Sequence, residues 1–214
     1  MRINTGIYKG RKLVVPDGIR PTQEKVRKAL FDILGDIEGL SFLELFAGSA
    51  AIGFEAASRG VSELILVESN HKCQAAIKKN IESLAFEPSC LYPQEAGKAI
   101  ERIFREHKKL DIIFLDPPYY KNVSLGGNPS AKVFSKLLPE TTKAPGHRIS
   151  TAESLSKKTL QILEAYDILA PNGFIIAQHF KKDILPDNVG KLTLFKQSVY
   201  GDTLLSFYKK QESI

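Results

Sequence analysis

The chain has 214 residues, 43% hydrophobic and 25% charged, which is typical of one globular domain of ordinary size with a small appendage. No apolar run approaches the length that spans a membrane, which excludes a helical membrane protein. The two cysteines, Cys73 and Cys90, lack the spacing of a metal site and are too few for a disulfide framework. We therefore expect no metal and a reducing, cytoplasmic setting.

The net charge of +6 is concentrated near the N-terminus. Residues 1–30 contain eight Lys and Arg residues against two acids, which accounts for the whole excess. A basic end on a neutral body favours a polyanionic partner such as a nucleic acid. The alternative is a solvated basic segment without a partner, which charge alone leaves open.

The first elements are a short arm and a helix. Residues 1–16 are expected to form short strands with turns at Gly6 and Gly10, and they contain few apolar side chains, so this arm must lean on another part of the chain. A helix is expected to begin at Thr22, a good N-cap residue, and to end at Gly35. Apolar residues follow Thr22 at helical spacing.

From about residue 40 onward, strands and helices alternate. Strands are expected at 43–46, 64–67, 90–92, 110–116 and 173–177, helices at 52–58, 71–84, 96–108 and 160–169, and a closing hairpin at 192–200 and 203–208. This alternation predicts a parallel sheet with right-handed crossovers. The hairpin allows one edge strand to run antiparallel.

Residues 121–150 break this regularity. They are polar, carry Gly126-Gly127-Asn128-Pro129 and lack a period. A long structureless stretch is unusual inside a domain, so we interpret it as a flexible insertion. Its cations would alternatively suit a lid over a nucleic acid.

The segment Asp116-Pro117-Pro118-Tyr119 ends an apolar strand at a stiff corner, because proline cannot continue a central strand. Open α/β sheets bind ligands at this edge. Asp116 and the Pro117 carbonyl can each accept a hydrogen bond from an amine, and Tyr119 can stack on the ring that carries the amine. Asp-Pro-Pro alone would favour a plain proline turn, but with the aromatic Tyr119 next and a glycine loop upstream the corner favours recognition of a flat amine.

A second set of residues predicts a nucleoside site. Gly48 follows the first strand and Glu68 follows the second, twenty residues later, a spacing that places an acid on a ribose beside a glycine turn. Ala50 replaces the second glycine of the dinucleotide fingerprint, which argues against a pyrophosphate. Glu95, after the third strand, could accept a hydrogen bond from adenine, or could be a plain surface acid. A nucleoside without phosphates beside an amine grip suggests S-adenosyl-L-methionine and methyl transfer to nitrogen.

Several motifs together resemble the DPPY class of amino-methyltransferases, and within it the bacterial 16S rRNA (guanine-966-N2)-methyltransferases of the RsmD type. The segments that carry the resemblance are Leu45-Phe46-Ala47-Gly48-Ser49, Leu115-Asp116-Pro117-Pro118-Tyr119, Thr5-Gly6, Lys9-Gly10-Arg11-Lys12-Leu13, Arg20-Pro21-Thr22, Val26-Arg27 and Tyr200-Gly201-Asp202-Thr203. The departures from the family pattern are Ala50 in place of a usual glycine, Glu95 in place of a shorter acid, and the insertion at 121–150.

The resemblance implies a Rossmann-like class I methyltransferase fold, α/β, with a mostly parallel seven-stranded sheet, an antiparallel edge strand and a small basic N-terminal β arm. It implies an arm and helix at 1–36, a methyltransferase domain at 37–214, and a monomer that acts on 16S rRNA of the small ribosomal subunit, away from membranes. The catalytic residues would be Asp116, Pro117, Pro118 and Tyr119. The S-adenosyl-L-methionine-binding residues would be Arg20, Thr22, Phe46, Gly48, Ser49, Glu68, Ser69, Glu95, Ala96 and Asp116. The RNA-binding residues would be Arg2, Lys9, Arg11, Lys12, Lys25 and Arg27.

Three other functions fit parts of the pattern. A DNA adenine-N6 methyltransferase would use the same corner but should carry a target-recognition domain, for which there is little room. A nicotinamide-dependent oxidoreductase is disfavoured by the missing second glycine. A silent RNA-binding module would leave the amine grip without a purpose.

Overall fold

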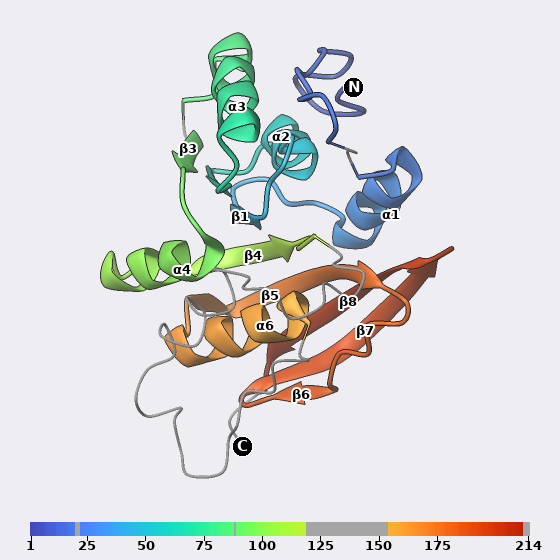
Figure 1. Ribbon diagram of the computed structural model, residues 1–214, viewed down its shortest axis with the longest axis vertical. Coiled ribbons are helices and arrows are strands. Elements are labelled where there is room, and N and C mark those ends of the chain that lie inside the picture. The colour runs from blue at the N-terminus through green and yellow to red at the C-terminus, as the bar shows by residue number, and fades with distance from the viewer. Residues whose placement is uncertain (20–21, 88, 119–153, 212–214) are drawn as a thin grey trace.

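The computed structural model describes residues 1–19, 22–87, 89–118 and 154–211 (Figure 1). The strands are β1 (Ser41–Leu45), β2 (Glu63–Val67), β3 (Ser89–Tyr92), β4 (Leu110–Leu115), β5 (Leu169–Phe180), β6 (Asn188–Val189), β7 (Leu192–Tyr200) and β8 (Thr203–Lys210). The helices are α1 (Glu24–Leu34), α2 (Ala51–Ser58), α3 (His71–Leu84), α4 (Ala96–Arg105) and α6 (Leu155–Tyr166). The predicted insertion at 121–150 lies outside the described residues.

All eight of these strands form one sheet in the order β3-β2-β1-β4-β5-β8-β7-β6. Strands β1 to β5 are parallel, which confirms the predicted parallel sheet, whereas β8 pairs antiparallel with both β5 and β7. The described part of the sheet has eight strands rather than seven, because the two-residue β6 adds an edge. β8 lies inside the sheet rather than at its edge, and its run from Leu204 to Tyr208 is buried without alternation, as expected for an interior strand.

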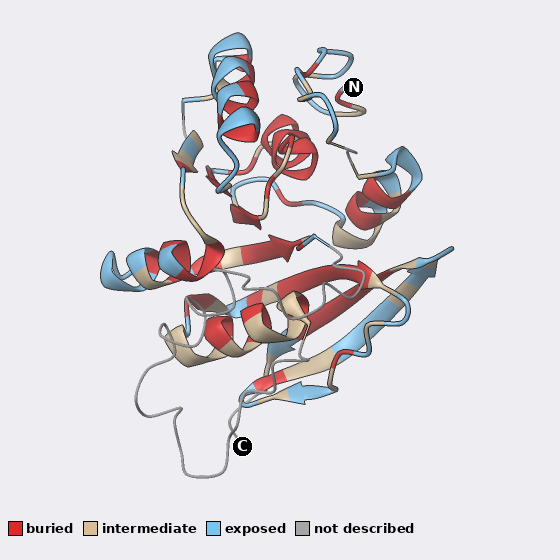
Figure 2. Cartoon of the chain, in the orientation of Figure 1, coloured by how far each residue is buried: buried red, intermediate tan, exposed pale blue. Residues whose placement is uncertain are grey.

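The sheet separates two hydrophobic cores. Successive side chains of β1 point to opposite faces, so Phe42 packs in one core and Leu43 in the other. The first core includes Leu30 of α1, Phe54 of α2 and side chains of α3, and the second lies under α4 and α6. Figure 2 shows the buried central strands between these helical layers. Of the described helices, three therefore cover one face and two cover the other.

Several helix boundaries differ from the prediction, including the end of α4 at Arg105 instead of 108. Helix α1 begins at Glu24 with Gln23 at the N-cap, so Thr22 does not cap it, although Gly35 ends it as expected with φ of 69°. Helix α6 begins earlier than predicted because the Ser154 hydroxyl accepts a hydrogen bond from the Lys157 amide. It ends before Leu169, which belongs to β5 instead.

The N-terminal arm is a short antiparallel pair that side chains of the helices hold in place. A bridge joins Arg2 and Lys12, and the N–H groups of Ile3 and Leu13 donate to the carbonyls of Arg11 and Met1 at 3.1 and 2.9 Å, so the predicted strand pairing is present in its shortest form. The buried Asn80 amide of α3 accepts from the Val14 N–H at 2.8 Å and donates to its carbonyl at 3.0 Å. Ile3 of the arm is buried in the same core as α1 and α2. The arm is thus packed against the helices of one face.

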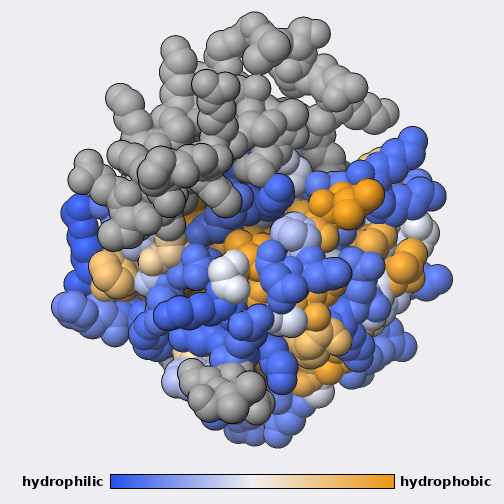
Figure 3. Space-filling view, turned by 90° about the horizontal axis from the view of Figure 1, so that it is seen from below, coloured by the Kyte–Doolittle hydropathy of each residue, from blue (hydrophilic) through white to orange (hydrophobic). Residues whose placement is uncertain are grey.

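The opposite end of the sheet carries a mixed surface. Among the described residues, Ile184, Phe195 and Val199 are exposed large apolar side chains near or on β7. In the view from below, hydrophobic patches lie between hydrophilic side chains (Figure 3). In the described part of the chain, no helix combines the length and the apolar character needed to cross a bilayer.

Candidate active site

The carboxyl ends of β1, β2 and β4 open into one pocket of about 460 Å³. This is the edge at which parallel α/β sheets place their ligands. Nine of the predicted site residues line it: Thr22, Phe46, Gly48, Ser49, Glu68, Ser69, Asp116, Pro117 and Pro118. The structure therefore brings the predicted glycine turn, ribose acid and amine grip around one cavity.

The turn after β1 has an unusual backbone. Phe46, Gly48 and Ala50 all have positive φ, of 61°, 55° and 54°. This region is open to glycine but costs free energy for Phe46 and Ala50. The Ala47 N–H donates to the Val67 carbonyl at 2.9 Å, which ties the turn to the end of β2. The turn is consequently a fixed loop that leads directly into α2.

Glu68 connects the two strand ends. One carboxylate oxygen accepts from the Gly48 N–H at 2.7 Å and the other from the Asn70 N–H at 2.7 Å. The proximity that the twenty-residue spacing predicted is therefore observed. A carboxylate has about four acceptor positions, so two remain for ligand hydroxyls.

The corner after β4 has a partner that sequence reasoning missed. The Gln178 side-chain amide, on β5, donates to Asp116 Oδ2 at 2.7 Å. Gln178 is 6% exposed, and within the described ranges its Oε1 has no hydrogen-bond partner. The signal available in the sequence was an amide side chain that directly follows the apolar run at 174–177. Tyr119 lies outside the described residues, so its predicted stacking role stays a prediction.

Glu44 is a second residue that the motifs did not single out. It lies on β1, is 4% exposed, lines the pocket and accepts from the Gly53 N–H of α2 at 2.8 Å. Burial, together with the charges of Asp116 and Glu68, raises the pKa of Glu44 to about 8, although the hydrogen bond from Gly53 opposes the rise. Glu44 is therefore mostly neutral at pH 7. The signal was an acid inside a strand whose every position is buried.

Three predicted cofactor residues are not in this pocket or not described. Glu95 stands at the N-cap of α4 without a side-chain capping bond, and Ala96 is buried in the second core. Neither lines the pocket, so their contact with adenine stays a prediction. Arg20 lies outside the described residues. Among the described residues, no group of three or more His, Cys, Asp and Glu could hold a metal ion.

The predicted RNA-binding residues divide into two groups. Arg2, Lys9, Arg11, Lys12 and Lys25 are exposed. Arg27 is 2% exposed, donates to the Arg2 carbonyl and Asn4 Oδ1 at 2.9 Å each, and lies 3.7 Å from the Glu55 carboxylate. Arg27 therefore joins α1 to the arm, and its contact with RNA stays a prediction.

Comparison with known proteins gives the chain its relatives. The sequence profile of the family described as "Conserved hypothetical protein 95" matches residues 1–140. "Putative rRNA methyltransferase YlbH" of Bacillus subtilis is 30% identical over 99% of this chain and 100% of its own length. "Ribosomal RNA small subunit methyltransferase D" of Escherichia coli K12 is 26% identical over 99% and 90% of the two chains.

The fold agrees with these relatives. The solved structure of "Putative methyltransferase yhhF from Escherichia coli" has a TM-score of 0.72 and 25% identity, and covers 99% of this chain and 98% of that one. The mixed, mostly parallel sheet is therefore that of an α/β methyltransferase-like fold. The chain belongs to the RsmD/YlbH family, which the Conserved hypothetical protein 95 profile describes.

Proposed function

We propose that this protein transfers a methyl group from S-adenosyl-L-methionine to the N2 amine of a guanine in 16S ribosomal RNA, at position 966. The observation that carries the proposal is one pocket lined by the Gly48 turn, Glu68 and the Asp116-Pro117-Pro118 corner. The names of the relatives in Bacillus subtilis and Escherichia coli support rRNA as the substrate class.

The pocket fits a nucleoside that carries no phosphate. Glu68 keeps acceptor positions for the ribose hydroxyl pair. Gly48 has no side chain, and the space beside it is open, since the nearest atom to a Cβ there would belong to Ile19 at 3.8 Å; a ligand can therefore approach the backbone closely. The position where dinucleotide-binding proteins have their second glycine is occupied by Ala50, which is fully buried at the N-cap of α2. The turn therefore lacks the glycine that lets a backbone approach a pyrophosphate. Gly48, Ser49, Phe46, Glu68 and Ser69 would hold S-adenosyl-L-methionine, with Arg20, Thr22, Glu95 and Ala96 as further predicted contacts. The cofactor supplies an already activated methyl group.

The Asp116 corner would orient the amine. The lone pair of the guanine N2 amine is delocalised into the ring, so the amine is a poor nucleophile and must be aligned with the methyl group. Asp116 and the Pro117 carbonyl, each accepting one N–H, would direct that lone pair. A charged Asp116 would also favour the positive charge that grows on nitrogen. The proton can leave after transfer, to Asp116 or to water, so no strong general base is required.

The base must reach the pocket from an unpaired RNA segment, because a stacked base inside a duplex cannot enter it. Tyr119 would stack on that base. The exposed cations of the arm would contact phosphates, which strengthens binding in a salt-dependent manner and contributes little sequence information. We place these cations in an arm at 1–36 and the chemistry in a methyltransferase domain at 37–214.

Mass mapping of ribosomal RNA nucleosides tests the proposal. Small subunits from cells that lack the protein should show one unmethylated guanine, and incubation with the protein and S-adenosyl-L-methionine should convert it to N2-methylguanine. A parallel reaction on duplex DNA tests the alternative, a DNA adenine-N6 methyltransferase. Methylation of adenine in DNA, without methylation of rRNA, would overturn the assignment.

A further inference from the structure

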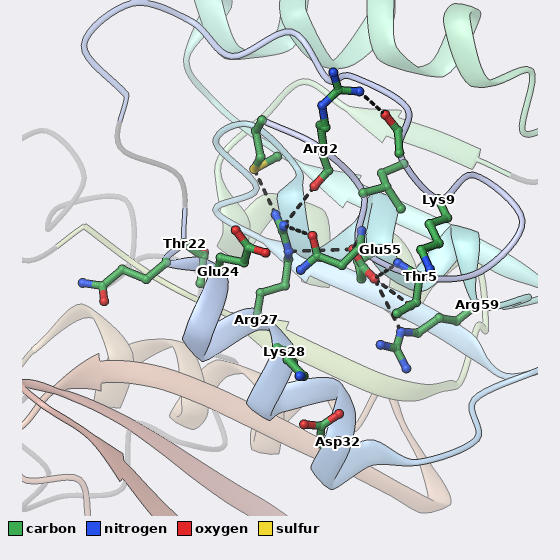
Figure 4. Close-up of a pocket in the computed structure, with 15 residues that line it drawn as sticks. Arg2, Thr5, Lys9, Thr22, Glu24, Arg27, Lys28, Asp32, Glu55 and Arg59 are labelled. Carbon is green, nitrogen blue, oxygen red and sulfur yellow. Dashed lines mark hydrogen bonds and ion pairs between the residues drawn. The ribbon is translucent and has the colours of Figure 1, made fainter.

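A second cavity, of about 810 Å³, lies between the N-terminal arm and α1 (Figure 4). We call it the arm cleft. Five cationic side chains and three acids line it: Arg2, Lys9, Arg27, Lys28, Arg59, Glu24, Asp32 and Glu55. Arg11, Lys12 and Lys25 of the predicted RNA-binding set do not line it. The cleft therefore collects some of the basic side chains of the N-terminal region, together with Arg59 at the end of α2.

The floor of the arm cleft is built on Glu55, a carboxylate of α2 that is 1% exposed. Glu55 accepts from the Asn4 N–H at 2.8 Å, and from the Thr5 N–H and hydroxyl at 2.9 and 2.8 Å. Arg27 and Arg59 each lie 3.7 Å from its oxygens. Its negative charge is thus matched inside the protein, which leaves the cleft with an excess of positive charge.

Arg59 is held in a fixed orientation at the arm cleft. Its guanidinium lies 4.5 Å above the Phe31 ring and its Nε lies 3.7 Å from Glu55, so ring and carboxylate hold it in place. Among the described residues its buried Nε has no hydrogen-bond partner, while 21% of the side-chain surface remains exposed. A guanidinium whose plane is fixed suits bidentate binding of a phosphate through its outer nitrogens.

The arm cleft adjoins the pocket at the sheet edge. Thr22, in the segment that leads into α1, lines both cavities. A nucleotide whose base enters the pocket must carry its backbone out on one side. The arm cleft offers positive charge on that side, directly across Thr22.

We propose that the arm cleft binds a backbone phosphate of the RNA strand beside the target nucleotide. Arg59 provides the fork of donors, while Lys9 and Lys28, which are exposed, provide point charges at the rim. This inference rests on the proposed function, and it adds Lys28 and Arg59, which no sequence motif indicated. Glu55 and Arg27 hold the arm and α1 so that these donors share one cleft.

The test compares variants with equal charge changes, using small ribosomal subunits from cells that lack the protein as the probe. K9A/K28A removes two cleft charges, and K98A/K196A removes two exposed charges from α4 and β7, outside both cavities. We expect K9A/K28A to weaken subunit binding about tenfold and to flatten its salt dependence by about one unit of slope. K98A/K196A should stay within about twofold of the wild type.

The variant R59K distinguishes bidentate phosphate binding by a guanidinium from simple attraction by a positive charge. It keeps the positive charge but loses bidentate geometry, so we expect about tenfold weaker subunit binding with unchanged S-adenosyl-L-methionine binding by calorimetry. Thermal unfolding shows whether R59K is misfolded. If it is, the inference is tested by K9A/K28A, which alters exposed side chains only. Equal binding by K9A/K28A and K98A/K196A would overturn the inference. Failure of the wild type to methylate any subunit would instead overturn the proposed function.

Discussion

Gln178 Nε2 donates to Asp116 Oδ2 at 2.7 Å, across the two neighbouring strands β5 and β4. The orientation of the amide is fixed by chemistry, because a carboxylate only accepts and the NH2 group must therefore face it. One oxygen of Asp116 is held from the sheet interior. The carboxylate is thus held in part by a residue 62 positions further along the chain.

Replacing Gln178 should reduce the rate of methyl transfer. Gln178→Leu keeps the volume and removes the donor, so the Asp116 carboxylate loses one of the contacts that orient it toward the amine. We expect kcat to fall about tenfold to a hundredfold, while the calorimetric Kd for S-adenosyl-L-methionine stays within about twofold. Gln197→Leu is the matched control, because Gln197 donates to Ser206 on β8 and does not line the pocket. An unchanged kcat in Gln178→Leu would show that Asp116 is positioned without it.

Replacing Asp116 should abolish turnover. In Asp116→Ala the amine loses one acceptor and the growing positive charge loses its counter-charge, which together are worth about three orders of magnitude or more in kcat. The test is single-turnover methylation of small subunits with tritium-labelled cofactor. Cofactor affinity, measured separately, should change little. Near-normal turnover would show that another group grips the amine.

The sequence predicted the site where spacing and strand order determine proximity. Gly48 and Glu68 follow adjacent parallel strands, so their contact could be expected from twenty residues of separation. Gln178 and Arg59 could not be found in this way. Their partners depend on which strand lies beside β4 and on how the arm docks, and both follow from tertiary packing.

The same limit explains the differences in the fold. A hairpin pattern at 192–208 does not indicate which of its two strands pairs with β5. In the structure this strand is β8, whose residues are buried without alternation, as expected for a strand inside the sheet. The turns of the arm correctly indicated a short antiparallel pair, but its contacts with the Glu55 and Asn80 side chains could not be read from the sequence. The burial of Arg27 could not be predicted either, because a charged residue type does not by itself indicate how far the side chain is buried.

The buried Glu44 predicts a change of stability with pH. Its pKa is about 8 in the folded protein against 4.5 when unfolded, so the folded state keeps its proton while the unfolded state loses it. The stability contribution is therefore fully present below pH 4.5 and is lost as the pH rises to about 8, by up to ~1.4 kcal/mol per pH unit. Glu44→Gln, which does not titrate and can still accept from Gly53, should lack this loss.

Urea unfolding of both proteins at several pH values between 5 and 8 checks this. The free energy of unfolding of Glu44→Gln, minus that of the wild type, should grow steadily with pH in this window. The comparison cancels the other titrating groups, which the two proteins share. A difference that stays constant with pH would mean that Glu44 is already charged in the folded protein.

Two glycines of the arm make a matched pair for its docking on α2. Both have positive φ, 75° at Gly6 and 81° at Gly10, so alanine at either position costs about 1 kcal/mol of backbone strain. A Cβ at Gly6 would also lie 1.6 Å from the Ser58 carbonyl oxygen, whereas a Cβ at Gly10 meets nothing within 4 Å. That carbonyl accepts from the Ile7 N–H at 2.8 Å and belongs to the helix backbone, so it cannot move aside.

Gly6→Ala should therefore release the arm, while Gly10→Ala should leave it docked. We expect Gly6→Ala to lower the free energy of unfolding by about 2 kcal/mol more than Gly10→Ala, because contacts of Ile3 and the Glu55 hydrogen bonds are lost with the clash. Limited proteolysis should cut the arm of Gly6→Ala first, at its exposed lysines and arginines. Since the arm forms one wall of the arm cleft, Gly6→Ala should also bind small subunits more weakly than Gly10→Ala. Equal proteolysis of the two variants would show that the arm docks without the Gly6 contact.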